Sequence, residues 1–138
     1  MTFSGFFEFL GNLEWLAVLL GTLGTMVLGY LWYGPLFGKL WASKSGAGMQ
    51  TGEPAKMVQT AVYFVVFNIA LQYLGLVIGK FDIEHALVAG IILGILAIGP
   101  ALYSRSVWAK THMTVFFIDL GFWFAATAVA IIVQGFVF

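Results

Sequence analysis

One ionisable side chain lies inside a long apolar stretch of this chain. Asp119 follows Met113 by about six residues, and no other charge occurs between Met113 and Phe138. If this stretch crosses a membrane as a helix, the carboxyl group is roughly 9 Å inside. An aspartate at the centre of a span costs about 2.5 to 3.5 kcal/mol, so it must face other helices, be paired or be protonated. Two roles are open: a proton or cation relay, or a carboxyl group that locks helices together.

A second polar group follows helical spacing. Asn68 and Gln72 are four residues apart and share a helix face with Gly75 and Gly79. In lipid, amides bond between helices and glycines permit close approach, so this stripe predicts a helix contact, with solute coordination as the alternative. Tyr63 is at about the depth of Asp119. Its hydroxyl is therefore a candidate partner of that carboxyl group if the two helices are neighbours.

Small residues recur at four-residue spacing in two other apolar stretches. This pattern predicts close helix crossing, either within one chain or between subunits. The residues are Gly21, Thr25 and Gly29 in the first stretch and Gly90 and Gly94 in the third.

Other reactive groupings are weak. The chain has no cysteine, which excludes disulfides and thiolate metal sites. His85 and His112 are at predicted span boundaries on opposite sides of the membrane, so interfacial solvation accounts for them better than haem or metal binding. There is no nucleophile with a histidine base and no phosphate-binding loop. We expect no enzyme activity, no cofactor and no metal.

The elements that must position these residues follow from composition. Hydrophobic residues make up 62% of the 138 residues and charged residues only 9%, whereas a soluble domain carries roughly 25% charged residues. Four uncharged stretches remain, each long enough to span a bilayer. The sequence predicts an all-α membrane protein, a single four-helix transmembrane domain over residues 1–138. The helices are expected at about 13–33, 57–79, 86–103 and 113–134, with Pro35 and Pro100 bending or ending the first and third.

Lysine and arginine are distributed unevenly over the loops. The loop 34–56 and the loop before the fourth helix hold five of them, whereas the two tails and the second loop hold only Lys80. The positive-inside rule therefore places loop 34–56 in the cytoplasm and both termini on the outer, periplasmic side. The N-terminal segment lacks the basic residues of a cleavable signal peptide, so we expect the first span to be retained.

The first loop has two parts. Residues 45–54 have the composition of a flexible connector. Residues 35–44 mix aromatic residues with lysine, which is typical either of a short segment at the headgroup level or of a plain loop anchored by Trp41. A loose echo between residues 40–44 and 107–110 leaves an internal two-plus-two duplication open.

The run LGYLWYGPLFGKLW at residues 28–41 resembles the signature of the bacterial membrane family called domain of unknown function 1761. A weaker match joins residues 105–108 to residues 117–123, and the resemblance covers essentially the whole chain. Gly34 stands where that family usually has serine, and Asp119 where asparagine is expected. The resemblance implies a four-helix integral membrane protein without catalytic residues to carry over. The matching positions are Trp32, Tyr33, Pro35, Phe37, Gly38, Lys39 and Trp41.

These features leave two main hypotheses for function. The leading one is a homo-oligomeric module for transport or permeation of an ion, proton or small solute, because four helices alone are too slim to enclose a wide pore. The alternative is an accessory or structural subunit of a larger membrane complex. The formal net charge is zero without any basic run, which argues against nucleic acid as a partner. We expect a multi-pass protein of the inner (plasma) membrane whose partners are the lipid bilayer and either copies of itself or another membrane protein.

Overall fold

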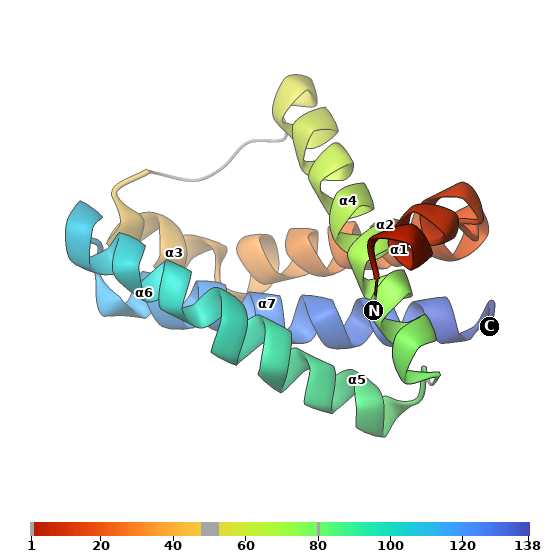
Figure 1. Ribbon diagram of the computed structural model, residues 1–138. Helices are drawn as coiled ribbons and strands as arrows, with labels where there is room; N and C mark the ends of the chain where they lie inside the picture. The colour runs from red at the N-terminus through yellow and green to blue at the C-terminus, as the bar shows by residue number, and fades with distance from the viewer. Residues whose placement is uncertain (1, 48–52, 80) are drawn as a thin grey trace.

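The computed structural model of the protein describes residues 2–47, 53–79 and 81–138 (Figure 1). Every regular element in these residues is a helix, and four helical segments are long and apolar enough to cross a membrane, with 22, 25, 27 and 23 residues. The predicted all-α fold with four potential membrane spans is confirmed. In chain order the elements are α1 (Phe3–Gly11), α2 (Trp15–Leu31), η1 (Trp32–Leu36), α3 (Gly38–Ser45), α4 (Pro54–Ile78), α5 (Ile83–Ala89), η2 (Gly90–Ala97), α6 (Ile98–Ala109) and α7 (Met113–Gly135).

The last span, α7, is the central helix. Half of its apolar window is buried, against 28% in each of the other three spans. It contacts α2, α3, α4, α5, η2 and α6. Alanine is prominent in the buried core, in keeping with membrane helices that pack through small residues. One core cluster contains Phe64, Phe122 and Ala126, and the other contains Leu71, Ala86, Ala89, Ala128, Ala130 and Ile131.

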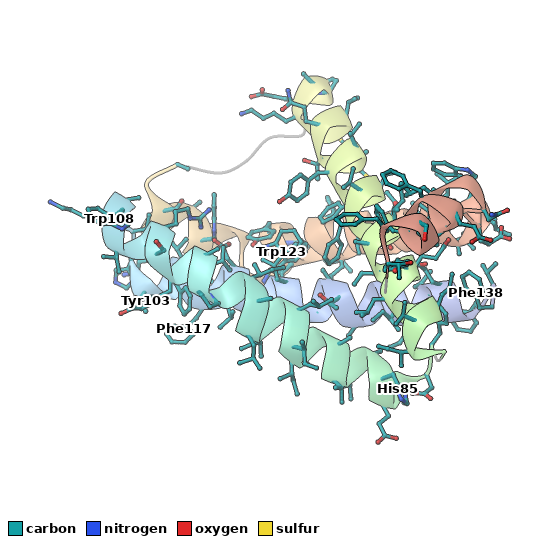
Figure 2. All side chains as sticks on the ribbon, in the orientation of Figure 1. His85, Tyr103, Trp108, Phe117, Trp123 and Phe138 are labelled. Carbon is teal, nitrogen blue, oxygen red and sulfur yellow. The ribbon has the colours of Figure 1, made fainter. Side chains whose placement is uncertain are left out.

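The two ends of the bundle differ in charge. Both termini lie at one end beside the α4–α5 turn, and α3 and the α6–α7 turn lie at the other (Figure 1). We call the second the basic end, because Lys39 and Lys44 of α3 and Arg105 and Lys110 of the α6–α7 region are there. Trp108 is 85% exposed at this end (Figure 2), where an interfacial aromatic residue is expected. Lys80 and residues 48–52 of the predicted connector lie outside the described residues.

Neither proline ends its span. Pro35 is inside η1, a π-helical turn that leads on to α3. Pro100 comes three residues after the last residue of η2, a second π-helical stretch, within the continuous span Ile83–Ala109. The third span therefore runs from Ile83 to Ala109, past the predicted end at Tyr103. The segment that follows Pro35 is the helix α3 and not a plain loop.

α4 and α1 diverge from a regular four-helix bundle. α4 crosses the other spans steeply, and its N-terminal half leaves the bundle (Figure 1). α1, which the sequence analysis did not predict, packs against α4 through Phe6 and Phe9, whose rings meet Tyr73 at 5.3 and 5.0 Å. Phe3 and Phe7 of α1 are exposed, as in an amphipathic helix that lies at a membrane surface.

Candidate functional site

Two groups of polar side chains are buried between the helices, and the first surrounds Asp119 near the basic end. Tyr33 Oη donates a hydrogen bond to Asp119 Oδ1 over 2.6 Å, and Trp41 Nε1 donates to the same oxygen over 3.1 Å. Arg105 Nη2 lies 2.6 Å from Asp119 Oδ2 and forms a salt bridge with it. We call these four residues the ionic cluster. Asp119 is only 6% exposed, so its charge is matched within the protein and does not face lipid.

The π-helical turn explains how the first span reaches α7. Pro35 has no backbone N–H, so regular α-helical bonding is interrupted, and the N–H of Phe37 donates instead to the Trp32 carbonyl five residues back, at 2.8 Å. Within this turn Trp32 Nε1 donates to the carbonyl oxygen of Ile118 on α7, at 3.0 Å. Tyr33, the next residue, bonds to Asp119, the residue after Ile118. η1 is thus held to α7 by two adjacent contacts.

Aromatic rings cover the inner side of the ionic cluster. Phe122 is 4% exposed, and its ring centroid lies 5.2 Å from that of Tyr33 and 6.4 Å from that of Trp32. Phe64 of α4 completes the contact at 6.0 Å. Because rings exclude water and lower the local dielectric constant, they strengthen the attraction between the buried carboxylate and its donors.

The seven matching positions of the signature at residues 28–41 divide into two sets. Trp32, Tyr33 and Trp41 donate hydrogen bonds to α7, so the motif supplies most of the donors around Asp119. The remaining motif positions shape or flank the turn and α3: Pro35, Phe37, Gly38 and Lys39.

Tyr63 is not the partner of Asp119. Its side chain is 63% exposed, and its ring packs near Phe64 and Trp123. The hydroxyl group that reaches Asp119 belongs to Tyr33 of η1. Depth along a span does not determine which helix lies beside α7 at that level.

The second buried group, which we call the amide cluster, contains Thr25, Asn68, Gln72 and Gln134. All four are fully buried and join α2, α4 and α7. Gln134 Nε2 donates to the backbone oxygen of Asn68 at 3.0 Å and to Asn68 Oδ1 at 3.1 Å. Asn68 Nδ2 donates to the Phe64 carbonyl at 2.9 Å and to Thr25 Oγ1 at 3.4 Å. The predicted role of Asn68 and Gln72 in a helix contact matches this arrangement.

Gln72 joins α4 to the start of α2. Its Oε1 accepts from the N–H of Glu14 at 3.0 Å, and its Nε2 donates to the Glu14 carbonyl at 3.0 Å. Nε2 also lies 3.5 Å from Gln134 Oε1. Glu14 is the N-cap of α2, so Gln72 accepts from an N–H that a helix start leaves unpaired, and it shares the Glu14 carbonyl with the N–H of Val18.

The small residues predicted to permit close packing differ in how much space they have. A Cβ atom on Gly21 would overlap Asn68 Oδ1, and one on Gly94 would come within 2.6 Å of the backbone of Phe124 on α7. One on Gly90 would lie 2.9 Å from the Phe124 ring. By contrast, a Cβ atom on Gly29 would lie 3.7 Å from the nearest atom of Phe122, an ordinary contact. The crossings at Gly21, Gly90 and Gly94 are all within one chain.

Sequence reasoning missed two residues: Gln134, and Arg105 as the ion-pair partner of Asp119. The first of these has a simple explanation. Gln134 is near the end of α7 and was read only as the boundary of the fourth span. The sequence contains a signal for Gln134, because it is an amide in an otherwise apolar run. If successive spans alternate in direction, the second and fourth spans end on the same side, so Gln134 lies toward Asn68 and Gln72.

The histidines lie outside both clusters. His85 Nδ1 is 2.6 Å from Asp82 Oδ1 at the start of α5, and His112 Nδ1 accepts from the N–H of Thr114 at the start of α7. Within the described residues no three His, Cys, Asp or Glu side chains are close enough to hold a metal ion. Each histidine therefore acts at a helix start.

An open groove of about 790 Å³ adjoins the ionic cluster. It lies between the diverging half of α4 and the η2–α6 segment, and Trp123 of α7 also lines it (Figure 2). Arg105, Gln59 and Tyr63 are the polar residues of its wall, and the others are apolar or alanine. The Arg105 side chain is 53% exposed, so the ionic cluster is accessible from the groove. The Asp119 side chain on α7 is only 9% exposed, so the other side of the cluster is covered.

Comparison with known proteins shows the family of this chain. A family described as "Protein of unknown function (DUF1761)" matches residues 16–135, and the chain belongs to this family. The matched segment begins at the second residue of α2 and ends with the last residue of α7, so it contains every residue of both clusters. A search of curated proteins and a search of solved structures found no match.

Proposed function

We propose that this member of a family of unknown function is an accessory or structural subunit of a membrane complex, in which Asp119 locks helices together. The observation that carries this proposal is the occupation of both Asp119 oxygens by donors from three other elements. A relay requires a carboxyl group that exchanges protons with a path across the membrane. A carboxylate held by a tyrosine, a tryptophan and an arginine is suited instead to fixing η1, α3 and α6 against α7.

The amide cluster supports the same role. Its side chains bond to one another and to backbone groups of α2 and α4. Among the described residues, the one buried side-chain polar atom without a hydrogen bond is Thr111 Oγ1, which is in the α6–α7 turn outside both clusters. The polar groups inside the spans are thus used for helix contacts. We infer a role in binding and assembly without catalysis, cofactor or metal.

We place the protein in the inner (plasma) membrane of a bacterium with both termini outside. The bias of lysine and arginine toward the basic-end loops supports this orientation. A reporter fused after Phe138 should be active on the periplasmic side, and a tag inserted within residues 46–52 should be accessible only from the cytoplasm. A reporter after Phe138 that is active in the cytoplasm would reverse the assigned topology.

A homo-oligomeric transport or permeation module is the second candidate, and the groove beside the ionic cluster favours it. Arg105 is half exposed there, so an anionic solute can reach the guanidinium group and compete with Asp119 for it. In that case the salt bridge would open and close as the solute binds, and neighbouring copies would close the groove into a path.

Two measurements separate the candidates. The mass of the particle purified in mild detergent should exceed the 15.1 kDa chain by a second membrane protein if the role is accessory, whereas a closed homo-oligomer favours transport.

The second measurement is flux in proteoliposomes. Asp119→Asn keeps the size and hydrogen-bonding capacity of the side chain but cannot exchange a proton. The lock predicts the same particle and no pH-driven flux with either form. A homo-oligomer with a flux that Asp119→Asn abolishes would overturn the lock and establish the relay.

A further inference from the structure

We propose that the groove between α4 and the η2–α6 segment binds an anionic phospholipid from the leaflet at the basic end. This inference does not depend on the accessory role, since a lipid site is compatible with either function. It rests on three properties of the groove: where its polar residues are, how long it is, and how many donors of Arg105 are in use.

The polar residues of the groove are at one end. Gln59 and Tyr63 are in the N-terminal half of α4, and Arg105 is in the last turns of α6 at the basic end, so the polar residues line the part of the groove between these two helix ends. The opposite end is formed by Ala70 of α4 and Ala97 of η2, near the middle of their spans. A ligand that matches this wall has a polar head at the membrane surface and an apolar tail that points toward the bilayer centre.

The groove is long enough to hold much of an acyl chain. Gln59 and Ala70 are eleven positions apart on α4, so the wall extends about 16 Å along that helix. Trp123 and Phe67 form part of the wall between the two ends and offer flat apolar surfaces to an acyl chain.

Arg105 selects the charge of the head group. A guanidinium group has five N–H donors in a planar fork that suits phosphate, and the contact with Asp119 uses Nη2 alone. Asp119 is not part of the groove wall, and its charge is shared with Tyr33 and Trp41. Basic pockets between helices at a cytoplasmic face are known to bind anionic lipid head groups. The other charged residues nearby are Lys56 and Glu53 at the start of α4, which pair with each other at 3.5 Å.

The test uses the full chain in nanodiscs made from an equal mixture of phosphatidylglycerol and phosphatidylcholine. After extraction into detergent and extensive washing, retained lipid is counted by mass spectrometry. We expect the wild type to retain phosphatidylglycerol over phosphatidylcholine by about fivefold, the factor that one basic side chain contributes. Arg105→Gln should reduce this ratio to about one. Lys39→Gln, which removes the same charge from the exposed surface of α3, should leave it unchanged.

Ala101→Phe keeps the test decisive if Arg105→Gln does not fold, because Ala101 lines the groove and takes no part in the ionic cluster. This variant should lower the number of retained lipids without changing the thermal unfolding midpoint. A wild-type ratio near one, a ratio equal in Arg105→Gln and Lys39→Gln, or full lipid retention in Ala101→Phe would overturn the proposal. Dimers in the wild type that Ala101→Phe converts to monomers would also overturn it, because a second copy would then occupy the groove.

Discussion

The ionic cluster and the amide cluster are both buried contacts of α7, yet they stabilise the bundle in different ways. The ionic cluster gathers three donors on one carboxylate, so all its bonds depend on a single charged acceptor. In the amide cluster each side chain both donates and accepts, and backbone groups supply several of the partners. Removal of Asp119 therefore strands several donors at once, whereas removal of one amide leaves the others with partners. A polar contact in lipid is more robust when it is distributed.

The largest expected effect is at Asp119. Asp119→Leu should lower the free energy of unfolding by about 2 to 4 kcal/mol, because it breaks a largely buried ion pair and leaves the Tyr33 hydroxyl and Trp41 N–H without an acceptor. Asp119→Asn should cost about half as much, since an amide oxygen can still accept from Tyr33 and Trp41. Unfolding in increasing sodium dodecyl sulfate measures both values. Equal stability of the Leu variant and the wild type would contradict the lock.

The next effect compares two glycines of the same helix. Gly21→Ala should destabilise the protein by roughly 1 to 3 kcal/mol, because the added methyl group meets the side chain of Asn68 in the amide cluster. Gly29→Ala is the matched control: its methyl group has room beside Phe122, and alanine favours a helix over glycine by up to about 1 kcal/mol. Thermal unfolding in detergent should move the two midpoints in opposite directions. A shift of the same sign in both would contradict the close contact at Gly21.

A smaller effect distinguishes two tyrosines. A hydrogen bond to a charged group contributes about 1.5 to 3 kcal/mol. Because Arg105 leaves the cluster open to solvent on one side, Tyr33→Phe should cost less, about 1 kcal/mol. Tyr63→Phe should leave stability unchanged, because that side chain is exposed on α4. If the two substitutions cost the same in one sodium dodecyl sulfate titration, Tyr33 would not be the specific partner of Asp119.

The smallest effect is expected in the amide cluster. Gln134→Leu should cost about 0.6 to 1.7 kcal/mol, the range measured for interhelical hydrogen bonds in membranes. Asn68 keeps its bonds to Phe64 and Thr25, and Gln72 keeps both bonds to Glu14, so no second residue loses all its partners. A loss as large as that of Asp119→Leu would remove the difference between the two clusters.

The sequence determines how far along its span a residue lies much better than it determines which helices lie beside that residue. Asp119, Asn68 and Gln72 were recognised because a polar side chain inside an apolar run has few ways to be satisfied. The donors of Asp119 come from three separate elements, and Tyr33 lies 86 residues earlier in the chain, so the sequence does not state which helix faces α7. The π-helical turn that brings them there depends on Pro35 and on packing against Phe122, and packing is a tertiary property. The choice of Tyr63 shows the result of using depth alone.

The central position of α7 has a consequence for biogenesis. Among the four spans it is the last in chain order, so a growing chain inserts the other three before it. Until α7 arrives, Arg105 lacks its carboxylate, Tyr33 and Trp41 lack their acceptor, and Asn68 lacks the amide of Gln134. Polar groups without partners are costly in lipid. The first three spans therefore contain unpaired polar groups until the last helix inserts, and its insertion completes both clusters.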